Sequence, residues 1–394
     1  MGDESGGALH QLSQVFPDEI IVEILARLPV ESLLRFKSVS KSWLSLIATP
    51  DFMKQHHKTA AHNGEYSCLR LIGIFEHPHN HFREYSLHSM LHEPEVDPLI
   101  MDYSGDDDNL PMRIVGSCQG IICIAFGMEH FVLWNPSIKK YNYVPSIAES
   151  LSGYGCYVKD GFGYVESTDD FKIVAIFYCM FIDGPYTVHI YSLKTNEWRN
   201  IEGFSIGTPL DDSGKYACGK IHWLVDCDGS LDIVSLDLIT ESYARLGAPP
   251  NEATQPAVSR GCDGTCVTLG LFSGLLCVLY DDHRSRMDLW VMNEYGVTSS
   301  WSKLFVLPHL GAPGYFPHML RIWKLNDGNI FLSYGTAVAV YNPRIRGWAA
   351  PQINDVGSIY QADFYVESLV SPCNDDDDDD DDPDDAEMFE EMGL

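Results

Sequence analysis

Apolar residues near the N-terminus recur at the spacing of an amphipathic helix. The first set occupies offsets 0, 1, 4, 5 and 8, which places it on one helical face: Ile20, Ile21, Ile24, Leu25 and Leu28. Pro17 precedes this set, where a first-turn proline is tolerated, and Pro29 follows it directly. The pattern therefore predicts a short helix that begins near Pro17 and ends before Pro29.

Two more apolar clusters follow at once. The second comprises Leu33, Leu34 and Phe36, and the third repeats helical offsets of 0, 4, 7 and 8 at Val39, Trp43, Leu46 and Ile47. Ser38 is the expected N-cap of the third helix, because serine side chains accept hydrogen bonds from free amides at helix starts. Residues 14–58 are thus predicted to form a small all-α unit of three helices, preceded by a disordered lead at 1–13.

A unit of this size cannot easily stabilise itself. Domains below about 40 residues usually need disulfides, a metal or a partner, and no cysteine precedes Cys68. Two arrangements would cover the remaining apolar surface: a partner protein, or docking of the helices on the rest of the chain. The pattern alone favours neither.

From residue 59 on, the pattern changes to short apolar strands separated by glycine or aspartate turns. Five segments share an apolar strand, a polar turn and a closing aromatic residue, and they begin at Phe131, Val188, Leu231, Met287 and Val338. Each is predicted to be a β-hairpin. The repeat length of roughly fifty residues is typical of kelch-like β-propellers. We expect an all-β kelch-like propeller over residues 59–373, with a β-sandwich as the alternative.

The length of this region corresponds to about six blades. Residues 66–115 hold the least regular repeat. The segment at 360–370 alternates like a strand, so we expect it to pair with the first repeat and close the ring. Asp228 and Gly229 are expected at a hairpin turn. Ser273 lies in an apolar run, so we expect it in a buried, bent strand and not as a nucleophile.

The chain carries a formal net charge of −30, which its C-terminus explains only in part. Residues 374–394 contain 13 acids and no base, and they are predicted to form a disordered acidic tail. Residues 59–373 still hold 36 acids against 20 bases. This balance disfavours nucleic acid as a partner and favours a basic protein. No apolar run is long enough to predict a membrane segment.

The sequence has no GxSxG, HExxH or GxxxxGK[ST] motif, so we expect a non-catalytic protein without a cofactor. Its eleven cysteines lack paired spacing and are expected to be reduced thiols. A zinc site at Cys262 and Cys266 is disfavoured because no second pair accompanies them. A loop is likewise favoured over a metal site for His77, His79 and His81. No metal is predicted.

The N-terminal unit resembles the F-box of plant F-box proteins. The resemblance lies in Phe16-Pro17, Ile24-Leu25, Arg27-Leu28-Pro29, Ser32-Leu33, Arg35-Phe36-Lys37 and Val39-Ser40-Lys41-Ser42-Trp43, with Phe16 in place of the usual leucine. It implies docking on the Skp-type adaptor of an SCF (Skp, cullin, F-box) ubiquitin ligase, and through it on a cullin-RING ligase. Some of the matching residues will instead be internal to the unit. The residues expected at the adaptor contact are Pro17, Ile24, Leu25, Pro29, Leu33, Val39 and Trp43.

The β-region resembles the plant F-box-associated domain at residues 116–123 and around Trp134, Phe162 and Tyr365. The order of its motifs is most similar to S-locus F-box proteins, which recognise basic S-RNases in pollen. The resemblance implies a cytoplasmic and also nuclear adaptor that holds a target protein for ubiquitination. The residues that would bind the target are not identified. The alternatives are a propeller that binds a small ligand or glycan, and a scaffold that does not lead to degradation.

Overall fold

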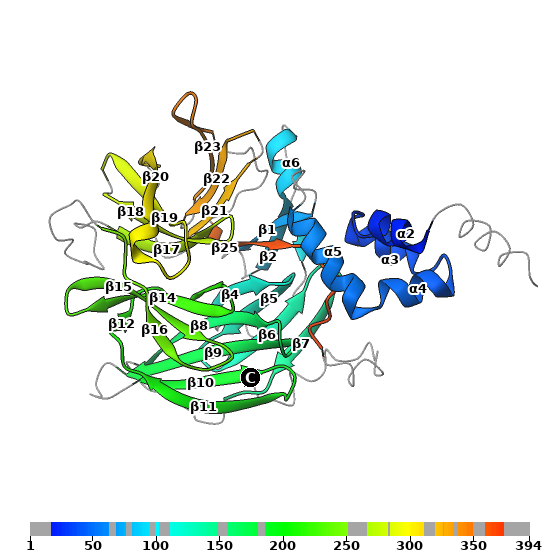
Figure 1. Cartoon of the computed structure of the whole chain (residues 1–394), viewed down its shortest axis with the longest axis horizontal. Coiled ribbons are helices and arrows are strands. Elements are labelled where there is room, and N and C mark those ends of the chain that lie inside the picture. The colour runs from blue at the N-terminus through cyan, green and yellow to red at the C-terminus, as the bar shows by residue number, and fades with distance from the viewer. Residues whose placement is uncertain are drawn as a thin grey trace, which may run out of the picture.

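The computed structural model describes residues 17–62, 68–75, 81–93, 99–101, 111–147, 156–179, 186–250, 266–282, 284–310, 320–325, 327–334, 337–349 and 359–373. The predicted lead at 1–13 and tail at 374–394 lie outside these residues. The helical unit consists of α2 (Asp18–Leu25), α3 (Val30–Phe36), α4 (Lys41–Ile47) and α5 (Pro50–His62). The remainder, the β-domain, contains strands together with α6 (Leu87–His92) and a short 3-10 helix, η1 (Thr298–Ser300). In Figure 1, α5 lies between the β-domain and helices α2, α3 and α4.

The three predicted helices are present as α2, α3 and α4, whereas α5 was not predicted. The domain boundary expected after residue 58 falls inside α5. Ser38 was the wrong N-cap for α4, because its hydroxyl donates to the carbonyl oxygen of Arg35 at the end of α3, at 2.7 Å. The N-cap is Ser40, whose side chain accepts a hydrogen bond from the backbone N–H of Trp43 at 3.1 Å.

The strands of the β-domain form antiparallel groups of four or five that follow one another along the chain. The first group combines β25 (Ile359–Val366) with β1 (Leu69–Phe75), β2 (His81–Ser86) and β3 (Leu99–Met101). The others are β4–β7 (Met112–Cys118, Ile121–Phe126, His130–Asn135, Lys140–Val144), β8–β11 (Cys156–Val165, Asp170–Cys179, Tyr186–Ser192, Glu197–Phe204), β12–β16 (Thr208–Pro209, Lys215–Ala217, Lys220–Cys227, Ser230–Asp237, Tyr243–Arg245), β17–β20 (Cys266–Phe272, Leu275–Asp281, Arg286–Met292, Trp301–Pro308) and β21–β24 (Leu320–Lys324, Ile330–Tyr334, Ala337–Asn342, Gly347–Ala349).

These groups are arranged around a common centre, as in a β-propeller (Figure 1). The inner strands β25, β4, β8, β13, β17 and β21 contact one another in that order. An ion pair between Arg321 on β21 and Asp363 on β25 completes the circle. The described residues thus contain six strand groups, but β17 and β21 also pair in parallel and join the last two groups into one sheet. The number of separate blades therefore stays a prediction.

The ring closes as the sequence predicted. Strand β25 pairs antiparallel with β1, from Leu69 opposite Val366 to Phe75 opposite Ile359. Gln361 ties the same strand to the next group, because its side-chain amide bonds both the N–H and the carbonyl oxygen of Ile114, each at 2.8 Å. The last strand that the structure describes is therefore the innermost strand of the first group.

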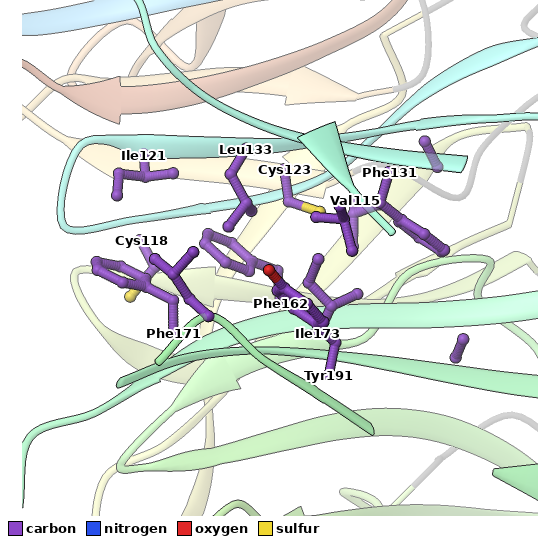
Figure 2. Packing of buried hydrophobic residues seen from close by; sticks show 14 of the residues in the cluster. Val115, Cys118, Ile121, Cys123, Phe131, Leu133, Phe162, Phe171, Ile173 and Tyr191 are labelled. Carbon is purple, nitrogen blue, oxygen red and sulfur yellow. The ribbon is translucent and has the colours of Figure 1, made fainter. Parts of the chain in front are cut away.

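The cores of the β-domain lie between neighbouring sheets. Between the second and third groups, residues from β4, β5 and β6 face residues from β8, β9 and β10, as Figure 2 shows. Alternation along each strand places these side chains on the buried face. The cluster includes Val115, Cys118, Ile121, Cys123, Phe131, Leu133, Phe162, Phe171, Ile173 and Tyr191.

All five predicted hairpins are confirmed, as β6–β7, β10–β11, β15–β16, β19–β20 and β23–β24. Asp228 and Gly229 have φ values of 53° and 86° and form the predicted turn between β14 and β15. The placement of Ser273 in a buried strand was wrong: it is exposed, with φ of 50°, beside Gly274 with φ of 81°. Two successive residues with positive φ make a tight hairpin turn, and this one joins β17 to β18.

Within the part of the chain that the structure describes, every helix is too short or too polar to span a bilayer.

Candidate functional site

The helical unit has a core that includes two of the residues expected at the adaptor contact. Leu33 is completely buried, and Leu25 is nearly so. Both pack with Ile47 of α4 and Phe52 of α5. These two are therefore among the matching residues that were expected to be internal to the unit, where they hold the helices together.

The other candidates lie at or near the surface. Ile24 is 53% exposed and Val39 is 52% exposed, although both are aliphatic. Pro17 and Pro29 are exposed and lie directly before α2 and α3. Trp43 is half-buried, with its ring centroid 5.4 Å from that of Phe36 in an edge-on contact.

The structure adds two residues to this surface. Ile20 lies four positions before Ile24 on α2, and Leu44 lies on α4; both are exposed. Residues four apart share a helix face, so Ile20 and Ile24 form one stripe. We call Ile20, Ile24, Val39 and Leu44 the apolar surface of the helical unit. Four of the 11 exposed large hydrophobic side chains among the described residues thus lie on this small unit.

Helix α5 completes the helical unit from the side of the β-domain. His56 of α5 is buried, and its Nε2–H donates to the carbonyl oxygen of Leu28 at 2.8 Å. Burial lowers the pKa of His56, which keeps the ring neutral. The neighbouring His57 has its pKa lowered to about 4, again mainly by burial. Neither histidine therefore adds charge to this junction at neutral pH.

The helical unit packs directly on the β-domain. Leu369, which follows β25, is a buried member of the helical core, and Ile138 from the turn between β6 and β7 packs against it. Two ion pairs flank this contact, Lys54 with Asp169 at 2.8 Å and Lys58 with Glu166 at 3.1 Å. Solvent-exposed pairs of this kind contribute little, so the apolar contact carries the junction.

Asn135 fixes the chain that makes this contact. This buried side chain donates from Nδ2 to the carbonyl oxygens of Ser368 and Val370, at 3.0 and 2.8 Å. Asn142 donates in the same way to Pro372 at 3.1 Å. The segment after β25 therefore runs along the second strand group and is held at the helical unit.

The centre of the ring carries buried charges. Arg113 on β4 pairs with Asp160 on β8 at 2.5 Å, and Arg321 pairs with Asp363 through two hydrogen bonds. Asp363 holds the pKa of Arg321 above its usual value despite burial, which opposes this rise. Lys215 on β13 is also buried here. A charged lining at the centre was not predicted, because single charged residues within strands give no signal of their own.

No group of three or more His, Cys, Asp or Glu side chains among the described residues could hold a metal ion. Cys262, His77 and His79 lie outside the described residues. His81 begins β2, and Cys266 begins β17.

Known proteins resemble the chain along nearly all of its length. Residues 14–55 match the F-box domain, and residues 80–362 match the F-box associated beta propeller domain. An F-box/kelch-repeat protein of Arabidopsis thaliana is 30% identical over 363 residues, which cover 90% of this chain and 95% of the relative. The F-box protein CPR1 of the same plant is 26% identical over 395 residues, covering 91% and 90% of the two chains. The chain therefore belongs to the F-box proteins that carry an F-box associated β-propeller domain.

Proposed function

We propose that this chain is a substrate-recognition subunit of an SCF-type ubiquitin ligase. Its F-box binds the Skp-type adaptor through Ile20, Ile24, Val39 and Leu44, with Pro17, Pro29 and Trp43 at the border of that contact. The observation that carries the proposal is the exposure of these aliphatic side chains on a segment that matches the F-box domain. The β-propeller holds the target protein, and the chain itself performs no covalent step.

The junction between the two domains supports this role. Because Leu369 belongs to the F-box core while β25 closes the propeller ring, the C-terminal strand connects both domains. A target on the propeller is then held at a fixed place relative to the adaptor. Fixed placement raises the effective concentration of the target at the ligase, which is how a non-catalytic subunit accelerates transfer.

Reconstitution tests this proposal. The full chain, mixed with a Skp-type adaptor, a cullin and a RING protein, should form one complex and should promote ubiquitination of proteins captured by the propeller. A complex that forms but never promotes ubiquitination would favour the non-degradative scaffold. Failure of the adaptor to bind at all would overturn the proposal.

We further propose that the target is a basic protein. The excess of 16 acids over bases at residues 59–373 supports this, because opposite charges accelerate association. A basic S-RNase is one candidate, by the resemblance to S-locus F-box proteins. Affinity purification followed by mass spectrometry would identify the target.

With the identified target, we expect association to slow as salt rises. The Debye length falls from about 10 Å at 0.1 M salt to about 3 Å at 1 M, which removes long-range attraction. Stopped-flow or surface-based kinetics should therefore show a lower association rate with little change in dissociation. The measurement uses a chain ending at residue 373, so that the acidic tail cannot attract basic proteins by itself. An acidic target, or an association rate independent of salt, would contradict this proposal.

A further inference from the structure

A cavity of about 250 Å³ lies where the centre of the ring opens beside α5. All six inner strands contribute to its lining, and His57 contributes from the F-box. Ser273 and Gly274, in the turn after β17, are exposed at its mouth. The cavity is smaller than the roughly 300–1,000 Å³ of typical drug-sized sites, so a ligand that fills it is small.

The lining combines apolar walls with a few polar groups. Three side chains of the lining belong to the Lys, Arg, Asp and Glu class: Lys215, Arg321 and Asp363. Asp363 forms an ion pair with Arg321. Lys215 is therefore the charged residue of the lining that has no ion-paired acid. The walls are formed largely by Leu69, Phe162, Leu271, Ile322, Trp323 and Phe364.

Lys215 is only 1% exposed, yet it has few partners. Its Nζ donates to the carbonyl oxygen of Ser213 at 3.1 Å, and no carboxylate of the described residues lies within 4 Å of it. Burial and the nearby Arg321 lower the pKa of Lys215 to about 8, so it remains mostly charged at neutral pH. A buried ammonium with so little compensation is costly unless another group pairs with it.

Three acids act on Lys215 from beyond ion-pair distance: Asp160, Asp211 and Asp363. Arg113 engages Asp160 and Arg321 engages Asp363. Burial raises the pKa of Asp211, and the charge of Lys215 opposes this rise. Arg113 and Arg321 each engage one of these acids at close range, whereas no salt bridge joins an acid of the described residues to Lys215.

Gly116 leaves the cavity open on the side of β4. A Cβ added at this position would meet no atom within 4 Å. A larger side chain at residue 116 would therefore enter the cavity without a clash at its Cβ. This glycine provides a way to fill the cavity that does not alter its charges.

We propose that this cavity binds a small organic acid, whose carboxylate pairs with Lys215 and whose apolar body packs against the surrounding walls. The carboxylate belongs either to a free acid or to the C-terminus of a peptide. This binding goes beyond the proposed role in the ligase and does not depend on the adaptor. The chemistry follows from a buried lysine without an ion-paired acid in the lining of a largely apolar cavity.

Benzoate and its neutral counterpart benzamide test the free acid. Saturation-transfer NMR and calorimetry on the full chain should show benzoate binding at least tenfold more tightly than benzamide, because only benzoate pairs with Lys215. Acetyl-phenylalanine and its C-terminal amide test the peptide terminus in the same way. Tighter binding of either acid than of its amide supports the proposal. It also identifies whether the carboxylate belongs to a free acid or to a peptide C-terminus.

Two variants locate the binding. Lys215→Met should lower the affinity for the acid at least tenfold, because it removes the charge. Gly116→Leu should lower that affinity by the same factor, because it fills the cavity. Gly347→Leu is the matched control, because a Cβ there meets only Ile345, at 3.6 Å and beyond. Circular dichroism verifies that each variant folds. If Lys215→Met does not fold, Gly116→Leu alone tests the proposal. The proposal is overturned if neither acid binds, if acids and amides bind equally, or if the folded variants bind like the wild type.

Discussion

Deleting residues 359–394 is expected to abolish cooperative folding of the β-domain. The deletion removes β25, which pairs with β1 along its whole length and supplies the buried Ala362, Phe364 and Tyr365. It also removes Leu369 from the F-box core. Without this strand the ring is open, and β1 presents an unpaired inner edge. Thermal unfolding followed by circular dichroism should show a broad, weak transition or none.

The matched control deletes only residues 374–394. These residues follow the last contact that the structure describes, at Cys373, whose thiol lies 3.5 Å from the carbonyl oxygen of Tyr141. This shorter deletion should leave the melting temperature within a few degrees of that of the full chain. Equal, near-native melting of both deletions would mean that β25 does not close the ring.

Asp363→Ala is expected to lower the free energy of unfolding by about 3–5 kcal/mol, the usual cost of removing one partner of a buried ion pair. Asp363 is 1% exposed and accepts hydrogen bonds from Nε and Nη2 of Arg321, whose side chain is 13% exposed. The change leaves Arg321 without its carboxylate, close to the positive charge of Lys215. Urea denaturation should show the loss as a lower midpoint.

The double variant Arg321→Met with Asp363→Leu is the control for that change. Replacing both charges of a buried pair with apolar groups is often nearly neutral. The double variant should therefore recover most of the stability that Asp363→Ala loses. A cost below about 1 kcal/mol for Asp363→Ala would contradict a structural role for this pair, since ordinary surface substitutions fall in that range.

The hairpins were predictable because each carries its own local signal. In three of them, the aligned aromatic residues pair directly across the strands: Trp134 with Tyr141, Tyr191 with Trp198, and Tyr341 with Trp348. In the second of these pairs the ring centroids lie 5.4 Å apart. A fixed offset of seven residues around a short turn brings the two rings together, so the repeat is visible in sequence. Ring closure was predictable for a similar reason. The segment at 360–370 alternates like a strand, but no neighbouring strand in the sequence is free to pair with it.

The division of the F-box residues into core and surface was not predictable. Ile24 and Leu25 are adjacent and almost equally apolar, yet one is exposed and the other is buried. The difference depends on where α5 lies, and α5 has few apolar residues to reveal it: Phe52 is its only buried apolar residue among the described residues. Leu369 lies more than 300 residues from the helices it contacts, and no local pattern links the two. Burial that depends on contacts between residues far apart in the chain leaves no periodic pattern in the sequence.

The most direct test of the central claim is retention of the Skp-type adaptor by surface variants of the full chain. Ile24→Asp and Val39→Asp each place a charge on the apolar surface of the helical unit without entering its core. If these residues anchor the contact, each should cost about 2 kcal/mol or more, which is more than tenfold in Kd. Ile345→Asp is the matched control, because Ile345 is an equally aliphatic residue that is 76% exposed on the propeller.

Calorimetry with the purified adaptor measures the outcome, and circular dichroism verifies that each variant folds. We expect Ile24→Asp and Val39→Asp to lose binding while Ile345→Asp keeps the wild-type Kd. Wild-type affinity in the two F-box variants, or an equal loss in Ile345→Asp, would contradict the assignment of this surface to the adaptor.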